Sequence, residues 1–453
     1  MRITKISVTN LFGLFDHEIP LNAEEHATII HSPNGYGKTT VLTMINALFG
    51  GAYEPLRRIP FRELSVHFDN AAVLRLTKDK RNGSDVRTPD GNGVDLTFAF
   101  KEKPRSKVQS HVVKRLRGGE VHFPLGMIDH EIPELDQVGP DVWCFGPTGE
   151  ILSLEDVLER FGPRLSLPPS LLSELLKGKR VPGWLDEIQK AVNVRFIETQ
   201  RLLRFQSSRR SSKYGGRSTM FPASSVQTYS EELATAIQQK LAEYATLSQS
   251  LDRTFPTRLV KVTNVSSIEQ LRSSLRELET KRSQLITAGF LDKDKDGDFE
   301  ELQKIDDSNR NVLSVYIADV KKKLGVFDEL TTKIDLLVNI INSRFLFKKM
   351  SIGKKEGFVF TTPDNKSLSP ASLSSGEQHE LVLLYELLFK VSENSLLLID
   401  EPELSLHVGW QQPFLKDLLE IIRLTAFDVL IATHSPQIIH DRWDLTVELK
   451  GRE

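Results

Sequence analysis

The sequence contains a single cysteine, Cys144, among its 453 residues. One cysteine excludes an internal disulfide, and it also excludes a zinc site or zinc hook built from paired cysteines of this chain. Such a chain suits a reducing compartment. The N-terminal segment, MRITKISVTN, lacks the apolar core of a secretory signal peptide. We therefore expect a cytoplasmic protein.

Long apolar runs and an excess of either charge are also missing. The best membrane candidate, residues 381–389, falls well short of about 18 apolar residues and contains Glu386. We expect no membrane partner. The 59 basic and 61 acidic side chains leave a net charge of −2, which excludes a protein that coats nucleic acid by bulk charge but permits a local basic patch. With 39% apolar residues, the chain can bury a large core.

The spacing of apolar residues divides the chain into three segments. In 1–221, alternation of apolar and polar residues predicts strands at 3–8, 27–30, 64–68, 72–77 and 95–100. In 222–345, apolar residues recur every three or four positions, which predicts amphipathic helices packed as a short antiparallel hairpin or bundle. In 346–453 the pattern returns to α/β, with elements expected at 358–362, 378–390, 395–400 and 429–433.

The strongest motif is the segment 32–40, SPNGYGKTT, which follows a predicted strand and precedes an apolar helix. This context is typical of a phosphate-binding loop, although Ser32 replaces the usual first glycine. We expect Lys38 to reach the β- and γ-phosphate oxygens of ATP and Thr39 to hold Mg²⁺. The alternative is a plain glycine-rich turn at the start of a helix. The residues assigned to nucleotide binding are Asn34, Gly35, Gly37, Lys38, Thr39 and Thr40.

A second motif is LLLIDEP at residues 396–402. Four apolar residues predict a buried central strand. Asp400 then lies at the carboxyl end of that strand, where open α/β sheets bind their ligands, and we expect it to act on the Mg²⁺ shell. Glu401 is the candidate general base for an attacking water. An acidic strand-to-turn transition is the alternative.

Two further motifs complete the set. The segment LSSGEQ at 373–378 precedes a helix, so Ser374, Ser375, Gly376 and Glu377 are assigned to binding a γ-phosphate. A plain serine N-cap would explain the same residues. His434 follows a predicted strand, and we expect it to hydrogen-bond the γ-phosphate and sense hydrolysis. A lone histidine is more often structural, but its position after Glu401 favours a function.

In this order, the four motifs resemble those of ATP-binding-cassette (ABC) ATPases. The long insertion between Lys38 and Asp400 resembles the RecF/SMC/OLD-like branch rather than transporter subunits. The segments 373–389, 396–411 and 431–439 resemble OLD-family ATPases of bacterial anti-phage systems, among them the ATPase subunits of Septu and PARIS. The resemblance implies an α/β fold, an ABC-type ATPase head of mixed β-sheet lobes flanked by helices, with an inserted helical or coiled-coil domain at 222–345.

The resemblance also implies roles for residues outside the four motifs. Gln200 lies in a segment similar to the glutamine loop of the family, where it would contact Mg²⁺ and the attacking water. Ser405–His407 looks like the loop that couples two opposed sites, although His407 departs from the acidic residue common in transporters. The family's ATP site is composite, which implies a homodimer and leaves a higher-order ring open. Catalytic roles thus fall to Glu401, His434 and Gln200, and Mg²⁺ ligation to Thr39, Asp400 and Gln200.

Two weaker signals have plain alternatives. Residues 292–298 copy the start of an EF-hand loop, but position twelve is Gln303 instead of the bidentate glutamate, so a solvated acidic turn is favoured over calcium binding. Basic residues gather at 101–117 and at 201–217. They would contact nucleic-acid phosphates with a steep salt dependence, or they form a solvated or partner-docking face.

These expectations converge on a cytoplasmic ATPase of a bacterial defence complex that senses a phage-derived trigger. The chain ends soon after His434 without a recognisable nuclease site, so we expect a separate nuclease partner. Three alternatives stay open. A RecF/SMC-type DNA repair or recombination ATPase is disfavoured by the short insertion and the missing zinc hook. A transporter subunit is disfavoured by the separation of Lys38 and Asp400, and a catalytically silent scaffold by the intact Lys38 and Glu401.

Overall fold

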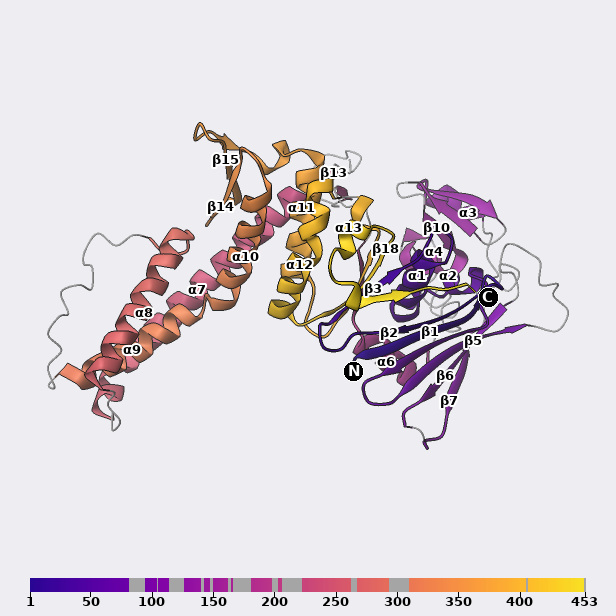
Figure 1. Ribbon diagram of the computed structural model, residues 1–453, viewed down its shortest axis with the longest axis horizontal. Coiled ribbons are helices and arrows are strands. Elements are labelled where there is room, and N and C mark those ends of the chain that lie inside the picture. The colour runs from indigo at the N-terminus through magenta and orange to yellow at the C-terminus, as the bar shows by residue number, and fades with distance from the viewer. Residues whose placement is uncertain are drawn as a thin grey trace. The chain divides into compact units, whose positions relative to one another are not determined.

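The computed structural model describes residues 1–80, 94–103, 105–113, 126–139, 142–146, 150–161, 164–165, 181–197, 203–205, 222–261, 267–292, 309–404 and 406–451 (Figure 1). The chain divides into two compact units, each assembled from segments that are distant in sequence. The first unit consists of residues 1–199, 391–404 and 411–453, and the second consists of residues 200–390 and 405–410.

A five-stranded sheet lies in the first unit, and all its neighbouring strands run parallel. Its order is β11 (Val194–Ile197), β17 (Leu396–Asp400), β18 (Asp428–Thr433), β3 (Ala27–His31) and β19 (Thr446–Glu448). The central strands are apolar runs, as expected for a parallel sheet buried on both faces. Their register pairs Asp400 with Ala432 and Thr433 with His31, so the carboxyl ends of β17, β18 and β3 share one edge.

A second, antiparallel sheet comes from the first half of the chain. Its order is β2 (Phe15–Pro20), β1 (Ile3–Leu11), β4 (Glu63–Phe68), β5 (Val73–Lys80), β6 (Val94–Lys101) and β7 (Gln109–Val113). A smaller sheet, β10 (Glu150–Ser153), β9 (Val142–Phe145) and β8 (Leu135–Gly139), packs with α3 (Gly126–Glu131) and α4 (Leu154–Phe161) around Trp143. The strands expected from alternation in this part of the sequence are thus confirmed.

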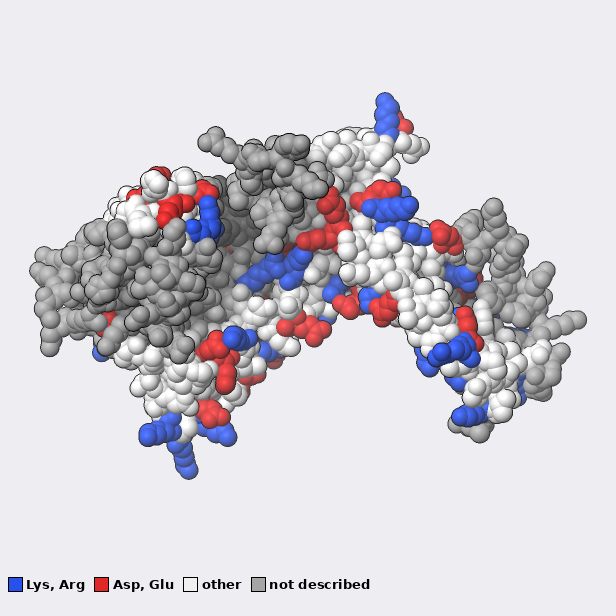
Figure 2. Space-filling model, turned by 180° about the vertical axis from the view of Figure 1, so that it is seen from behind, with Lys and Arg blue, Asp and Glu red and all other residues white. Residues whose placement is uncertain are grey.

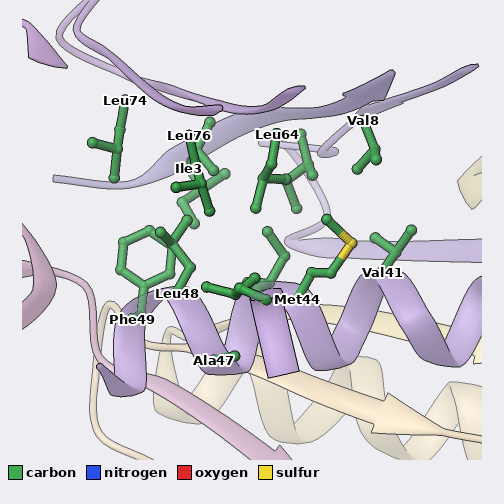
Figure 3. Close-up of a cluster of buried hydrophobic side chains, with 14 of the residues drawn as sticks. Ile3, Val8, Val41, Met44, Ala47, Leu48, Phe49, Leu64, Leu74 and Leu76 are labelled. Carbon is green, nitrogen blue, oxygen red and sulfur yellow. The ribbon is translucent and has the colours of Figure 1, made fainter. Parts of the chain in front are cut away.

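Helix α1 (Lys38–Gly50) holds the two larger sheets together. Figure 3 shows side chains of α1, among them Val41, Met44 and Leu48, packed against the antiparallel strands, where Ile3 and Leu64 lie. The helix also contacts β11, β17 and β18 of the parallel sheet. Each buried aliphatic side chain contributes about 1.5–3 kcal/mol. The helix that begins at the predicted phosphate-binding loop is therefore fixed on two sides. Further helices of this unit are α2 (Tyr53–Arg58), α6 (Gly183–Ala191), α13 (Pro436–Ile439) and most of α12 (Val408–Thr425).

The second unit contains the helices expected in the middle of the chain. They are α7 (Ser225–Val260), α8 (Ile268–Thr287), α9 (Arg310–Gly325) and α10 (Asp328–Arg344). Helix α9 packs on both α7 and α8, and the Arg258 guanidinium of α7 pairs with the Asp319 carboxylate of α9, with one contact at 2.7 Å. The 36 residues of α7 span about 54 Å.

The N-terminal part of α7 packs on the segment that carries the LSSGEQ motif. That segment comprises β14 (Lys349–Gly353), β15 (Gly357–Thr361), β16 (Ser367–Leu368), α11 (Ser375–Tyr385) and a π-helical turn, Glu386–Lys390; a short pair of strands, β12 (Leu203–Phe205) and β13 (Pro222–Ser224), precedes α7. Tyr229 of α7 donates a hydrogen bond to the Glu386 carboxylate and stacks on Tyr385 at a centroid distance of 4.6 Å. These contacts join the helices to the motif segment inside one unit.

The expected α/β architecture with an inserted helical region is confirmed. The assignment of the α/β part to an ABC-type head stays a prediction. The three segment boundaries proposed from the sequence stay a prediction. Among the described residues, no helix is both long and apolar enough to cross a membrane.

Gly357 provides a test of how α7 is attached to β15. Its φ is +71°, and a Cβ there would lie 2.0 Å from the Ser230 carbonyl oxygen of α7. We expect Gly357→Ala to lower the free energy of unfolding by at least about 2 kcal/mol in urea denaturation, because both the backbone and the neighbour must shift.

The matched control is Gly325→Ala at the end of α9. There the nearest atom to an added Cβ is the Asp328 Oδ2, at 3.9 Å. This variant should be neutral or stabilised by up to about 1 kcal/mol. Equal stability of the two variants would contradict the close contact between α7 and β15.

Candidate nucleotide site

The loop between β3 and α1 has the backbone that a phosphate-binding loop requires. Gly35 and Gly37 have φ values of 89° and 87°, in the left-handed region that favours glycine. A Cβ on Gly37 would lie 2.8 Å from the Leu11 Cδ2 atom. Gly37 is also the N-cap of α1 and brings no side chain to cap it. The first N–H groups of the helix are therefore left for an anion.

The Lys38 side chain lies beneath this loop and is only 5% exposed. Its Nζ donates hydrogen bonds to the carbonyl oxygens of Ser32 at 2.7 Å and Pro33 at 3.3 Å. A buried ammonium is costly unless it is paired and hydrogen-bonded. The two carbonyl oxygens provide hydrogen bonds but carry no negative charge to pair with the ammonium. A phosphate group would provide that charge.

A cavity of about 350 Å³ opens next to the loop. This volume lies in the range of small-molecule sites. Phe12, at the turn after β1, supplies an aromatic wall, and its φ of 54° is unusual for a bulky residue. The lining residues are Phe12, Asn34, Gly35, Gly37, Lys38, Thr39, Thr40 and Glu401. The nucleotide-binding residues predicted in the loop thus line one cavity together with the candidate general base.

Two oxygen atoms converge where Mg²⁺ is expected. The Thr39 hydroxyl donates a hydrogen bond to the Asp400 Oδ1 at 3.1 Å. Adjacent ligands of an octahedral Mg²⁺ are about 3 Å apart, so this pair fits one edge of such an ion. Within the described ranges, no group of three or more His, Cys, Asp or Glu side chains could hold a metal. Mg²⁺ is compatible with that, because it keeps waters and phosphate oxygens among its ligands.

The electrostatics of Asp400 support a cation at this position. Burial raises the pKa of the Asp400 carboxyl, and the nearby Glu401 and Glu403 carboxylates raise it further, whereas the Thr39 hydrogen bond and the Lys38 charge lower it. Clustered carboxylates of this kind are stabilised in their charged form by a bound cation.

Glu401 has an unusual backbone conformation directly after β17. Its φ of 43° lies in the left-handed region, and its N–H donates to the Ala432 carbonyl oxygen of β18 at 2.8 Å. Non-glycine residues in this region cost roughly 1–2 kcal/mol. Such strain concentrates at functional sites. The conformation leaves the Glu401 side chain 26% exposed, at the wall of the cavity.

His434 lies at the end of the neighbouring strand, β18, and its side chain is 44% exposed. Its Nδ1 atom is 3.7 Å from the Glu401 Oε1 and 3.3 Å from the Glu403 Oε1. The structure therefore brings together Lys38, Thr39, Asp400, Glu401 and His434 in the first unit. Glu403 was not predicted as a site residue, although a charged residue just after the DEP turn was a visible signal.

The LSSGEQ motif lies in the second unit, where it begins α11. Ser374 and Glu377 form a reciprocal capping box, in which each side chain bonds the backbone N–H of the other residue. Lys348 pairs with the Glu377 carboxylate at 2.6 and 2.8 Å. Burial raises the pKa of Glu377, but the bonds from Lys348 and Ser374 outweigh it, so that the pKa is lowered. The capping alternative for this serine is thus realised, and the γ-phosphate role stays a prediction.

The other predicted residues that the structure describes lie in the second unit. Ser375 and Gly376 occupy the first turn of α11, and a Cβ on Gly376 would meet open space. The His407 Nδ1 accepts a hydrogen bond from the Gly409 N–H. Gln200, Ser405, the basic stretch at 201–217 and all but the first residue of the EF-hand-like segment lie outside the residues or side chains that the structure describes.

His17 of β2 supports the loop from below and was not predicted. Its Nε2 donates a hydrogen bond to the Tyr36 carbonyl oxygen at 2.9 Å, and Phe15 lies against both rings. The His17 side chain is buried, and its Nδ1 atom has no hydrogen-bond partner among the described residues. Burial lowers the pKa of His17, with the Tyr36 bond and the Asp16 charge opposing it.

A family model described as "AAA domain, putative AbiEii toxin, Type IV TA system" matches residues 223–440, slightly less than half of the chain. The matched part contains the motif of α11, Asp400, Glu401 and His434, and it lacks the loop with Lys38.

One curated relative is the "Retron Ec83 probable ATPase" of Escherichia coli, 27% identical over 197 residues. The match covers 40% of this chain and 35% of the relative, so the chain spans about a third of that protein. The chain is therefore similar to part of a probable retron ATPase.

Two solved structures overlap the chain weakly. The Smc head domain of Pyrococcus furiosus, with an extended coiled coil and bound to the C-terminal domain of ScpA, gives a TM-score of 0.32 at 12% identity, covering 100% of this chain and 96% of that one. The SMC head domain of Thermotoga maritima gives 0.30 at 11%, covering 97% and 91%. At these TM-scores the overlaps carry no weight for function.

The buried His17 predicts a pH dependence of stability. Its folded-state pKa is lowered below the unfolded value of 6.5, so the unfolded chain takes up the proton first as the pH falls below 6.5. The contribution is therefore complete above pH 6.5 and is lost below it, by up to about 1.4 kcal/mol per pH unit. We expect His17→Gln, whose amide still donates to Tyr36, to lose less stability than the wild type between pH 7 and pH 5.5.

Urea titrations of both proteins at the two pH values measure the difference. His130→Gln is the control, because it replaces an exposed histidine in α3. An identical pH response of His17→Gln and the wild type would show that His17 does not stay neutral in the folded protein.

Proposed function

We propose that this chain is the ATP-binding and ATP-hydrolysing subunit of a bacterial anti-phage defence complex. In this proposal it senses a phage trigger and controls a separate nuclease chain in the cytoplasm. The observation that carries the ATPase part is that Lys38, Thr39 and Glu401 line one cavity at the edge of the parallel sheet, where the Thr39 hydroxyl also bonds Asp400.

Each residue has a distinct role in the proposed hydrolysis. Lys38 and the N–H groups at the start of α1 would hold the phosphates, while Thr39 and Asp400 would ligate Mg²⁺. The ion neutralises charge on the phosphates when it is bound. Glu401 accepts a proton from the attacking water. His434 lies beside Glu401 and would contact the γ-phosphate, and Gln200 would contact Mg²⁺ and the water.

The composite site is the second part of the proposal. The motif residues Ser374, Ser375, Gly376 and Glu377 of one subunit would close over the nucleotide held by the other, giving a homodimer. Ser375 is exposed in the first turn of α11, and the backbone N–H groups at the start of this helix are suitable ligands for an anion. ATP would then stabilise the dimer by mass action, and hydrolysis would release it. Further assembly into a ring is compatible with this arrangement.

The defence role is supported by the relationships and not by the site. The matching family is described by a putative AbiEii toxin of a type IV TA system, and the curated relative is a probable retron ATPase. Fold and ATP chemistry are shared by proteins of many functions, so the trigger and the nuclease partner are the parts that need experiment.

DNA repair is the second candidate, and the basic residues in the segments 101–117 and 201–217 of the sequence are the observation in its favour. Over most of the face drawn in Figure 2, the Lys and Arg side chains of the described residues are interspersed with Asp and Glu, and a few gather at the lower left tip. Such a mixed surface is typical of a solvated face. A DNA-stimulated ATPase that needs no protein partner would favour this candidate.

Glu401→Gln tests the ATPase and the assembly together. Without the base, we expect ATP to bind while kcat falls by about 10²-fold or more, so that the closed dimer accumulates. Phosphate release and light scattering with ATP measure the two effects. Lys38→Ala is the control, and it should neither bind ATP nor dimerise.

Purification of Glu401→Gln from its native host, followed by mass spectrometry, tests the partner. A stoichiometric nuclease supports the defence complex, and a dimer that carries DNA alone supports repair.

Hydrolysis by Glu401→Gln at the wild-type rate would show that another group is the base.

A further inference from the structure

We propose that Glu403 is a positioning residue of the ATPase site, which fixes the ring of His434 relative to Glu401. The inference rests on the proposed ATPase function and adds a residue to it. Glu403 lies in the short 3₁₀ turn Pro402–Leu404 that follows β17, two residues after the candidate base.

One oxygen atom of Glu403 contacts three groups at the end of β18. Its Oε1 accepts a hydrogen bond from the Thr433 hydroxyl at 2.7 Å and from the His434 N–H at 3.2 Å. The same atom lies 3.3 Å from the His434 Nδ1. A single carboxylate therefore holds both the backbone and the ring of His434.

The turn that carries Glu403 is itself anchored. The Gln411 side chain donates to the Glu403 carbonyl oxygen at 3.2 Å, and the Leu404 N–H donates to the Glu401 carbonyl oxygen at 3.1 Å. On the other side, the buried Thr433 hydroxyl also accepts from the Ser435 N–H at 3.0 Å. The links run without interruption from the turn after β17 to the loop after β18.

Burial argues that this carboxylate has more than a structural role. The Glu403 side chain is only 7% exposed, and its Oε2 is buried without a hydrogen-bond partner among the described residues. A buried oxygen that is left unsatisfied costs about 1–3 kcal/mol. An arrangement that served folding alone would gain from a neutral side chain here, so the cost points to a use of the charge.

The use we infer is control of the imidazole. A carboxylate at Nδ1 fixes which ring nitrogen carries the proton and how the ring is oriented. Nε2 lies on the opposite edge of the ring and is turned away from Glu403, so it is left for a ligand. Glu403 thereby also sets the 3.7 Å separation between the His434 Nδ1 and the Glu401 Oε1.

The test compares Glu403→Gln with Glu393→Gln. The amide of Glu403→Gln still accepts from Thr433 and the His434 N–H, so the loop is retained while the charge beside the ring is removed. We expect a 10- to 100-fold loss of kcat at unchanged KM, ATP affinity and melting temperature. Glu393 is exposed and lies just before the first residue of β17, Leu396. Its variant should behave as the wild type.

Thr433→Val gives a second, independent variant. It removes the hydroxyl that fixes Glu403 and keeps the volume of the buried side chain. We expect a similar loss of kcat, and the double variant with Glu403→Gln should lose no more than the more affected single variant, because both break one chain of contacts. The ¹⁵N shifts of the His434 ring should change in Glu403→Gln and stay unchanged in Glu393→Gln.

Wild-type kcat in Glu403→Gln, or a loss of kcat that only follows a loss of melting temperature, would overturn the positioning role. ATP hydrolysis by the wild type together with a fully active Glu403→Gln overturns this inference alone. A wild-type protein that does not hydrolyse ATP overturns the proposed function and the inference with it.

Discussion

The parallel register of β3, β18 and β17 is the constraint on which the rest of the first unit depends. It pairs Thr433 with His31 and Asp400 with Ala432, so that segments from the two ends of the chain finish at one edge. The Thr39 and Asp400 side chains, 361 residues apart in sequence, meet there in one hydrogen bond. Helix α1, packed between the two larger sheets, then fixes the loop at that edge.

The site could be predicted from the sequence where its chemistry is local. Lys38 and Thr39 lie in a loop whose glycines indicate a left-handed backbone conformation. Asp400 and Glu401 follow an apolar run that is typical of a buried strand. The alternation of apolar and polar residues likewise predicted strands of the two larger sheets, and helical spacing predicted the long helices of the second unit.

What could not be predicted depends on tertiary contacts. His17 is one polar residue in an alternating strand, and only the packing of β2 beneath the loop gives it the Tyr36 carbonyl as a partner. Glu403 becomes important only because β18 places Thr433 and His434 against it. At Ser374 the sequence permits two roles, and the observed capping box is compatible with both, since an N-cap serine stands at the end of a helix where anions also bind.

The left-handed backbone of Glu401 has a consequence for how this protein can change. Glycine, or to a lesser degree asparagine, would relax that turn, so the residue that the proposed chemistry needs is not the one that the backbone prefers. Selection for thermal stability alone would therefore tend to remove the candidate base. A stabilised descendant of this chain that kept the fold would be prone to become a protein that binds nucleotide without turning it over.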